Sequence, residues 1–173
     1  MIKFKKLDYI VKDKEGNETT MTSQGVLPTR SHATDAGLDL TATRLTQEVD
    51  PSGKLTLVYH TDIAVEIPEG YVGLLFMRSS VANRSITLVN AVGVIDSGYR
   101  GEIISKFKIT TDAIPSVYQP GEKFAQLVIV PIVLDDTEFV DELSETDRGT
   151  DGFGSTENKE VIESEVSNNE IEE

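Results

Sequence analysis

The sequence contains no cysteine, which excludes disulfides, thiolate nucleophiles and cysteine-ligated zinc. It also lacks long apolar runs, since none approaches the roughly 18 residues that a membrane-spanning helix needs. The first residues, MIKFKK, do not form the apolar core of a signal peptide. We therefore expect a soluble, cytoplasmic protein.

Basic residues are few, with 16 Lys and Arg against 30 Asp and Glu, and the formal net charge is -14. This balance argues against general binding of nucleic acid or of anionic membranes, although a few arginines and a cation can still neutralise an anionic ligand locally. Seven of the acidic residues lie in 157–173, beside a single lysine. Because such a segment buries too little apolar surface to offset its ordering entropy, we expect 158–173 to be a disordered acidic tail.

Helical periodicity is scarce, whereas strand-like runs recur. No long window repeats apolar residues at the spacing of one helical face. A short helical turn is expected only in 79–85, and 9–21 is expected to form a surface hairpin within 9–26. Strand-like runs with turn residues between them occupy 2–7, 55–59, 63–67, 71–77, 103–109 and 124–134. The length fits one domain, and the pattern predicts an all-β sandwich or jelly roll.

Familiar nucleotide and metal motifs are missing. The sequence has neither a P-loop nor the glycine fingerprint of dinucleotide-binding folds. Its two histidines, His32 and His60, are too few for a histidine-based metal centre, and we interpret both as structural or surface residues.

Residues 88–103 form the most informative stretch. An apolar run ends at Asp96, a Ser-Gly pair and Tyr99 follow, and a second apolar run begins at Ile103. Two such runs around a glycine-containing turn predict a β-hairpin with Asp96, partly desolvated, at its tip. An aspartate there either bonds its own backbone as a turn residue or serves as a general base in a pocket. The pattern alone leaves both interpretations open.

Two further stretches place polar side chains beside strands. Asp39 lies between two leucines, so strand alternation puts it on the opposite face, where a solvated residue is the simple alternative. Arg78, Ser79 and Ser80 follow an apolar strand, a pattern typical of an anion-binding turn but also of a surface loop.

Two more stretches lie toward the C-terminus. Gln126 interrupts an apolar strand, and a buried amide there needs partners, either within the protein or on a ligand. Residues 148–156 combine three glycines with Arg148, Phe153, Ser155 and Thr156. This composition is typical of a lid that clamps an anion and stacks on a ring. A flexible linker is the alternative.

Taken in order, five stretches resemble the five motifs of the homotrimeric dUTPase family: 36–42, 78–82, 90–101, 121–131 and 148–156. Each motif alone is weak, but five in the correct order and spacing are specific. Met77 and Ser80 stand where the family often has proline and glycine. The resemblance implies a distorted jelly-roll (β-clip) domain over 1–147, a mobile glycine-rich lid at 148–157, and a homotrimer whose sites are shared between chains.

The resemblance also implies an activity, namely Mg²⁺-dependent hydrolysis of dUTP to dUMP and pyrophosphate, which keeps uracil out of DNA and supplies dUMP for dTMP synthesis. Asp96 would orient the attacking water as general base, Tyr99 would pack on the deoxyribose, and Asp39 would hold Mg²⁺ through a water. The base would be read by the Asn90 amide and by the backbone of the hairpin, with the substrate-binding set including Gly93, Val94, Ile95 and Ile104.

The same resemblance places the remaining substrate contacts. The α- and β-phosphates would be held by Arg78, Ser79, Ser80 and Gln126. The lid would supply Arg148, Ser155 and Thr156 to the γ-phosphate and Phe153 to the uracil ring, with Gly154 beside it. One chain would provide the first, second and fourth motifs of each site, a second chain the hairpin and a third the lid.

Two alternatives belong to other functional classes. The related dCTP deaminases use a glutamate base near the hairpin, but residues 88–91 contain no acid, which argues against deamination. A non-catalytic, nucleotide-gated regulator with the same fold is the second alternative. Asp96 and the lid favour catalysis over that role without excluding a second binding partner.

Overall fold

The computed structural model describes residues 1–49, 51 and 53–150. The chain divides into two units, Met1–Leu134 and Asp135–Glu173. Within the described residues, the strands all belong to the first unit: β1 (Lys3–Lys6), β2 (Tyr9–Lys12), β3 (Glu18–Met21), β4 (Leu38–Thr41), β5 (Arg44–Val49), β6 (Leu55–His60), β7 (Ile63–Glu66), β8 (Tyr71–Met77), β9 (Ile86–Leu88), β10 (Gly93–Ile95), β11 (Ile104–Ile109) and β12 (Lys123–Pro131). The predicted tail, and residues 151–157 of the predicted lid, lie outside the described residues.

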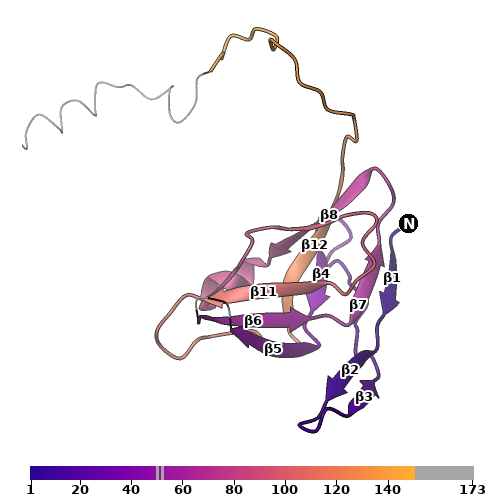
Figure 1. Cartoon of the computed structure of the whole chain (residues 1–173), viewed down its shortest axis with the longest axis vertical. Helices are drawn as coiled ribbons and strands as arrows, with labels where there is room; N and C mark the ends of the chain where they lie inside the picture. The colour runs from indigo at the N-terminus through magenta and orange to yellow at the C-terminus, as the bar shows by residue number, and fades with distance from the viewer. Residues whose placement is uncertain (50, 52, 151–173) are drawn as a thin grey trace, which may run out of the picture. The chain divides into compact units, whose positions relative to one another are not determined.

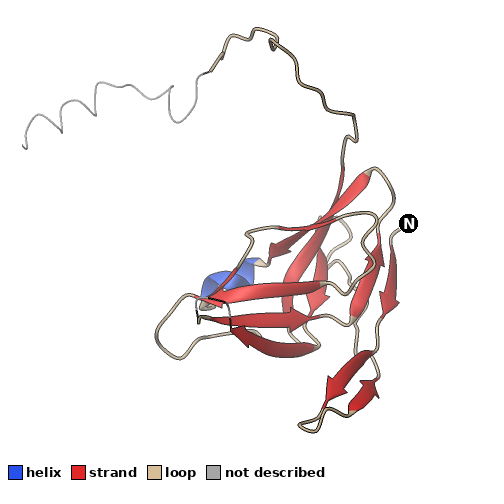
Figure 2. Cartoon of the chain, in the orientation of Figure 1, coloured by secondary structure: helices blue, strands red, loops and turns tan. Residues whose placement is uncertain are grey.

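The first unit is an all-β sandwich, as the sequence predicted (Figure 1, Figure 2). One antiparallel sheet has the order β10-β8-β12-β4 and the other has the order β5-β6-β11-β9. A single 3-10 turn, η1 (Ser79–Asn83), follows β8 where a helical turn was expected. This turn is the only helix in the part of the chain that the structure describes, so no helix there is long and apolar enough to cross a membrane.

Aromatic side chains from both sheets meet in the core. Tyr59 of β6 stacks on Phe124 of β12 with ring centroids 4.9 Å apart, and it makes a T-shaped contact with Phe107 of β11 at a centroid distance of 5.2 Å. Such contacts add to the free energy of burying the rings. The Tyr59 hydroxyl is satisfied by the backbone of Tyr118, although burial still raises the pKa of Tyr59 to about 12. These contacts hold the two sheets together beside the pocket described below.

Two small ribbons complete the first unit. β1 pairs with β7, and β2 pairs with β3 across a polar turn, which confirms the hairpin predicted for 9–21. Its base contacts the body of the unit, since the Arg44 guanidinium lies 3.9 Å from the centre of the Tyr9 ring. Two strands, β5 and β9, were not predicted, because β5 is mostly exposed and polar and β9 has only three residues.

The central hairpin predicted for 88–103 is wrong. β10 pairs with β8, whereas β11 pairs with β6 on one side and β9 on the other, so the two runs belong to different sheets. A two-stranded hairpin is marginal by itself, whereas separate pairing lets Ile95 and Phe107 both face the common core. The segment between β10 and β11 therefore crosses from one sheet to the other and leaves space between the two strands.

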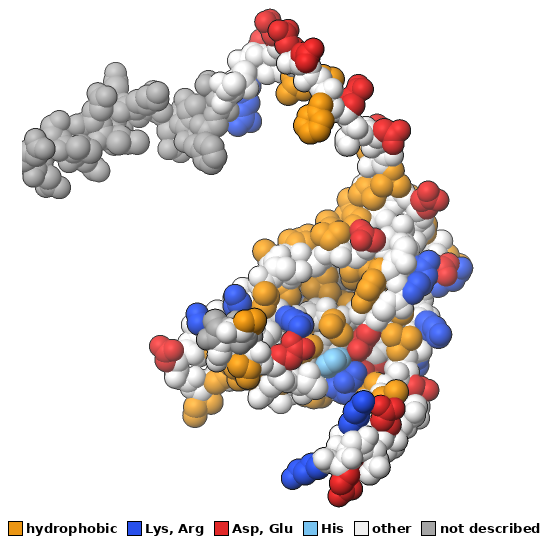
Figure 3. Space-filling model, in the orientation of Figure 1, with side chains coloured by type: hydrophobic (Ala, Val, Ile, Leu, Met, Phe, Trp, Pro, Cys, Tyr) orange, Lys and Arg blue, Asp and Glu red, His pale blue; other side chains and the backbone are white. Residues whose placement is uncertain are grey.

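The described part of the second unit, 135–150, is strongly acidic (Figure 3). It holds seven acidic side chains against the single base Arg148. A turn closes near its end, where the Gly149 amide donates to the carbonyl of Thr146 at 3.1 Å and Gly149 adopts a φ of 52°.

Candidate active site

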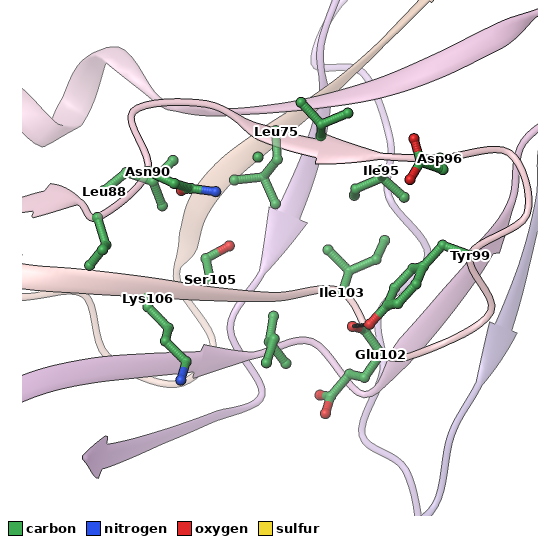
Figure 4. Close-up of a pocket in the computed structure, with 14 residues that line it drawn as sticks. Leu75, Leu88, Asn90, Ile95, Asp96, Tyr99, Glu102, Ile103, Ser105 and Lys106 are labelled. Atoms are coloured by element: carbon green, nitrogen blue, oxygen red, sulfur yellow. Dashed lines mark hydrogen bonds between the residues drawn. The ribbon is translucent and has the colours of Figure 1, made fainter. Parts of the chain in front are cut away.

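The space between β10 and β11 forms a pocket of about 370 Å³ (Figure 4). This volume lies within the range of small-ligand sites. Most of the lining is apolar, and the residues are Leu75, Leu88, Val89, Asn90, Gly93, Val94, Ile95, Asp96, Tyr99, Glu102, Ile103, Ile104, Ser105 and Lys106. The structure thus brings together all seven site residues predicted between 90 and 104. We call this cavity the base pocket, after the base contacts that the family resemblance implies for its residues.

Asp96 lies at the rim of the base pocket, directly after β10 (Figure 4). Its backbone takes part in a turn, because its carbonyl accepts a hydrogen bond from the Tyr99 amide at 3.0 Å. Among the described residues no group donates to its carboxylate, so the turn leaves that group available. The expected partial desolvation is absent from the single chain, where Asp96 is exposed. The reason is that β10 ends at Ile95 and the following residues leave the sheet.

Tyr99 is fixed beside Asp96 by its own loop. Its hydroxyl donates to the backbone carbonyl of Glu102 at 3.0 Å. The ring also lies over Gly101, where an added Cβ would be 2.4 Å from the tyrosine oxygen. A glycine at 101 is therefore needed for the ring to lie flat against the loop at one end of the base pocket.

Glu102 anchors this loop to the sheet that contains β6. One carboxylate oxygen accepts from the amides of Thr61 and Asp62 at 3.1 and 2.8 Å, and the other lies 3.1 Å from the His60 ring. Burial tends to raise the pKa of Glu102, but the His60 contact, the Asp62 amide and the Arg44 charge together lower it below its usual value. The carboxylate is therefore ionised at neutral pH and committed to the protein.

Arg44 joins Glu102 to a second, fully buried acid. Its guanidinium contacts the carboxylate of Asp62 at 2.8 and 2.9 Å and that of Glu102 at 3.4 Å. The Asp62 side chain has no exposed surface, and its backbone has a φ of 52°. The buried carboxylate depends on Arg44 for its compensating charge.

Arg44→Met is expected to lower the free energy of unfolding by about 3–5 kcal/mol, because it leaves the buried Asp62 charge without its partner. Urea unfolding at one fixed protein concentration would measure the loss. Lys3→Met is the matched control, since it breaks the exposed pair between Lys3 and Glu66 and should have little effect. Equal losses in the two variants would contradict the importance of the buried pair.

A second pocket, of about 440 Å³, lies where β4, β8 and β12 meet η1. Polar groups dominate it, and its lining residues are Ser31, Asp35, Ala36, Gly37, Asp39, Arg78, Ser79, Gln126 and Val128. We call it the polar cleft. It contains four of the predicted site residues, Asp39, Arg78, Ser79 and Gln126.

Asp39 is the electrostatic centre of the polar cleft. It projects from β4 on the face opposite the buried Leu38 and Leu40, as alternation predicted. One carboxylate oxygen accepts from Arg78 Nε at 2.8 Å, and the other accepts from Lys123 Nζ at 2.8 Å. Partial burial would raise the pKa of Asp39, but Lys123, Arg78 and the Ser31 hydroxyl lower it below its usual value. The cleft therefore presents an ionised carboxylate between two cations.

Gln126 makes a structural bond, the first of the two roles considered for it, and its oxygen remains at the polar cleft. Its amide nitrogen donates to the carbonyl of Met77 at 3.1 Å, a structural bond between neighbouring strands. Its oxygen lies over Gly37, where an added Cβ would be 2.4 Å away. A glycine at 37 thus leaves room for this oxygen in the polar cleft.

Of the other predicted residues, only Ser80 belongs to the described part of the first unit. The Ser80 hydroxyl is 2.8 Å from that of Tyr118 and does not line the polar cleft. Arg148 belongs to the second unit, and Phe153, Gly154, Ser155 and Thr156 lie outside the described residues. Sequence reasoning missed Lys123, although it falls within the fourth motif, and also Glu102 and Ser105. The residue types Lys, Glu and Ser do not by themselves indicate a functional position, which becomes visible only when the strands are paired.

The base pocket and the polar cleft share no lining residue within one chain.

A family model described as dUTPase matches residues 23–157. The chain belongs to the dUTPase family. The deoxyuridine 5'-triphosphate nucleotidohydrolase of Corynebacterium glutamicum is 44% identical over 131 residues, which cover 75% of this chain and 86% of that protein. The enzyme of the same name from Desulfitobacterium hafniense is 37% identical over 153 residues, covering 87% and 94%.

Solved dUTPase structures have the same fold. That of Staphylococcus bacteriophage 80alpha with dUpNHpp superposes with a TM-score of 0.67 at 31% identity, covering 90% of this chain and 97% of that one. A variant dUTPase of Staphylococcus aureus phage phi11, described with a structural Mg(II) ion, has a TM-score of 0.59 at 27% identity, covering 82% and 97%. The predicted jelly-roll fold and dUTPase family are therefore confirmed.

Proposed function

We propose that this protein is a dUTP diphosphatase that hydrolyses dUTP to dUMP and pyrophosphate. The observation that carries the proposal is that the chain forms both an apolar pocket that contains Asn90, Asp96 and Tyr99 and a polar cleft that contains Arg78 and Gln126. Relatives named for this activity cover most of the chain. In the cell, we place the reaction in the cytoplasm, where it keeps uracil out of DNA and supplies dUMP.

The base pocket explains selection of uracil. The Asn90 amide and the backbone from Gly93 to Ile95 offer donors and acceptors beside apolar side chains. A base with mismatched groups would bury them without partners, which costs more binding energy than a lost apolar contact. The Tyr99 ring, held against Gly101, packs on the sugar and leaves little room for a 2′-hydroxyl.

Asp96 is the general base in this proposal. Its carboxylate stands at the pocket rim with no donor bound to it among the described residues, so it can accept a proton from a water. That water would attack the α-phosphorus, and pyrophosphate would leave. The exposure of Asp96 in one chain allows a neighbouring chain to complete its surroundings.

The polar cleft suits the phosphates. Arg78, Ser79 and Gln126 face it and can contact the α- and β-phosphate oxygens. We also assign Arg148, Ser155 and Thr156 to the γ-phosphate and Phe153 and Gly154 to the base, with Ser80 supporting η1 through Tyr118. The second cation at Asp39, Lys123, adds positive charge at the same cleft.

The residues present fit Mg²⁺ as an ion held together with the substrate. In the described residues no three His, Asp or Glu side chains cluster to hold a metal by themselves. Mg²⁺ is commonly bound by one carboxylate plus phosphate oxygens and keeps several waters. Asp39 Oδ1 accepts only from Arg78 and keeps a lone pair, so the ionised Asp39 would hold the ion through a water. The ion would neutralise phosphate charge.

We further propose a homotrimer in which each site combines three chains. The base pocket and the polar cleft of one chain share no lining residue. In this proposal, a single dUTP occupies the base pocket of one chain and the polar cleft of another. The lid would come from the third chain. The second unit begins at Asp135, so residues 135–147 would connect the lid to the first unit.

Deamination of dCTP is disfavoured by Glu102, the other carboxylate that lines the base pocket. Both of its oxygens are occupied by protein donors, so it is not free to serve as the glutamate base of such an enzyme. Product analysis with dCTP would show deoxyuridine products if this assignment were wrong.

The proposed function predicts strong base and sugar selectivity. With Mg²⁺ present, dUTP should release pyrophosphate far faster than dCTP, dTTP or UTP, because each of these leaves polar or bulky groups unmatched in the base pocket. Comparing kcat/KM for the four nucleotides, with and without Mg²⁺, measures this. Discrimination below about tenfold would be too small for such a pocket and would count against the proposal.

A further inference from the structure

Ser105 places a hydroxyl in the base pocket that the proposed contacts do not use. It lies on β11, where alternate side chains face the core, and only 4% of the residue is exposed. Among the described residues its Oγ has no hydrogen-bond partner, and it is the one buried side-chain oxygen or nitrogen of that set without one. Buried hydroxyls are normally paired, because an unpaired one has lost its contact with water.

The direction of this hydroxyl points to a ligand. Figure 4 shows Ser105 projecting from β11 toward the side of the pocket where Asn90 and Leu75 lie, while Lys106 projects to the other side of the strand. The neighbouring lining residues Leu75, Leu88 and Ile103 are apolar and cannot accept or donate. A group that satisfies the Ser105 hydroxyl has therefore to enter the pocket.

We infer that Ser105 is a specificity-determining residue whose hydroxyl hydrogen-bonds to a carbonyl oxygen of the bound pyrimidine. The inference rests on the proposed function, since it names a further contact of the same base pocket. A hydroxyl can donate to a uracil carbonyl without competing with Asn90, which has its own donors and acceptor. The unpaired hydroxyl costs stability in the free protein, and the cost is recovered when the base binds.

Ser105→Ala tests this inference because it should weaken dUMP binding without destabilising the free protein. Removing an unpaired buried hydroxyl should leave the melting temperature of the nucleotide-free protein unchanged or raise it. The Kd for dUMP, measured by titration calorimetry, should rise about 2- to 12-fold, the factor for one hydrogen bond between uncharged groups. Substitution of a residue that only supports the fold would lower the melting temperature and leave the Kd for dUMP unchanged.

Ser23 provides the matched control. It is also buried, but its hydroxyl donates to the backbone carbonyl of Asp62 at 3.0 Å, outside the base pocket. Ser23→Ala should lower the melting temperature and leave the Kd for dUMP unchanged. If Ser105→Ala behaved in the same way, Ser105 would be a structural residue and the inference would be overturned.

Thio-substituted nucleotides show whether the contact is to the base. Sulfur is a weaker acceptor than oxygen. With one of the two analogues, 2-thio-dUMP or 4-thio-dUMP, the increase in Kd caused by Ser105→Ala should therefore largely vanish. The full penalty with both analogues would overturn the base contact. Failure of wild-type protein to bind dUMP would instead refute the proposed function, so the two failures are distinguishable.

Discussion

Asp96→Asn is expected to lower the turnover number for dUTP by about 10²–10⁴, the usual contribution of a general base. The substitution keeps the size of the side chain but removes the group that takes the proton from water. No protein group donates to the Asp96 carboxylate among the described residues, so the loss cannot be attributed to a broken structural bond. Steady-state pyrophosphate release would measure the turnover number.

Binding and folding should survive this substitution. A non-hydrolysable dUTP analogue should still bind, because the base pocket and polar cleft keep their other contacts. Asp112→Asn is the matched control, since Asp112 is exposed, lines neither pocket and loses the same charge. Turnover of Asp96→Asn similar to that of the control would move the general base to another residue.

Mixing two inactive chains is expected to restore activity if each site combines Asp96 of one chain with the lid of another. The first chain carries Asp96→Asn, and the second stops after Asp147 and so lacks the lid. After joint denaturation and refolding at equal amounts, random assembly gives about one quarter of the sites an intact Asp96 and an intact lid. Pyrophosphate release should therefore reach about a quarter of the wild-type rate.

Each parent refolded alone is the control and should stay inactive. If the lid closed over the Asp96 of its own chain, no mixed trimer could contain a complete site. A folded, trimeric mixture without activity would thus rule out the shared site while leaving the role of Asp96 untouched. Because all the described strands lie in Met1–Leu134, we expect the first unit to fold without the lid.

The sequence alone determined the fold class and the family. Strand alternation is local, so the pattern at 71–77 identified β8 with its observed bounds, and the polar turn after Lys12 identified the β2–β3 hairpin. Motif order and spacing are equally readable along the chain, which is why they suffice to identify Asp39, Asn90, Asp96 and Gln126 as candidate site residues.

Only the tertiary structure decided how the strands pair and what the polar side chains contact. The local pattern indicated that 88–95 and 103–107 form one hairpin. In the structure, β10 pairs with β8 and β11 pairs with β6 and β9, and this pairing leaves the space that forms the base pocket. The same long-range pairing brings Lys123 to Asp39, 84 residues away, and leaves the Ser105 hydroxyl unpaired between sheets. Such contacts depend on residues distant in sequence, and no local periodicity encodes them.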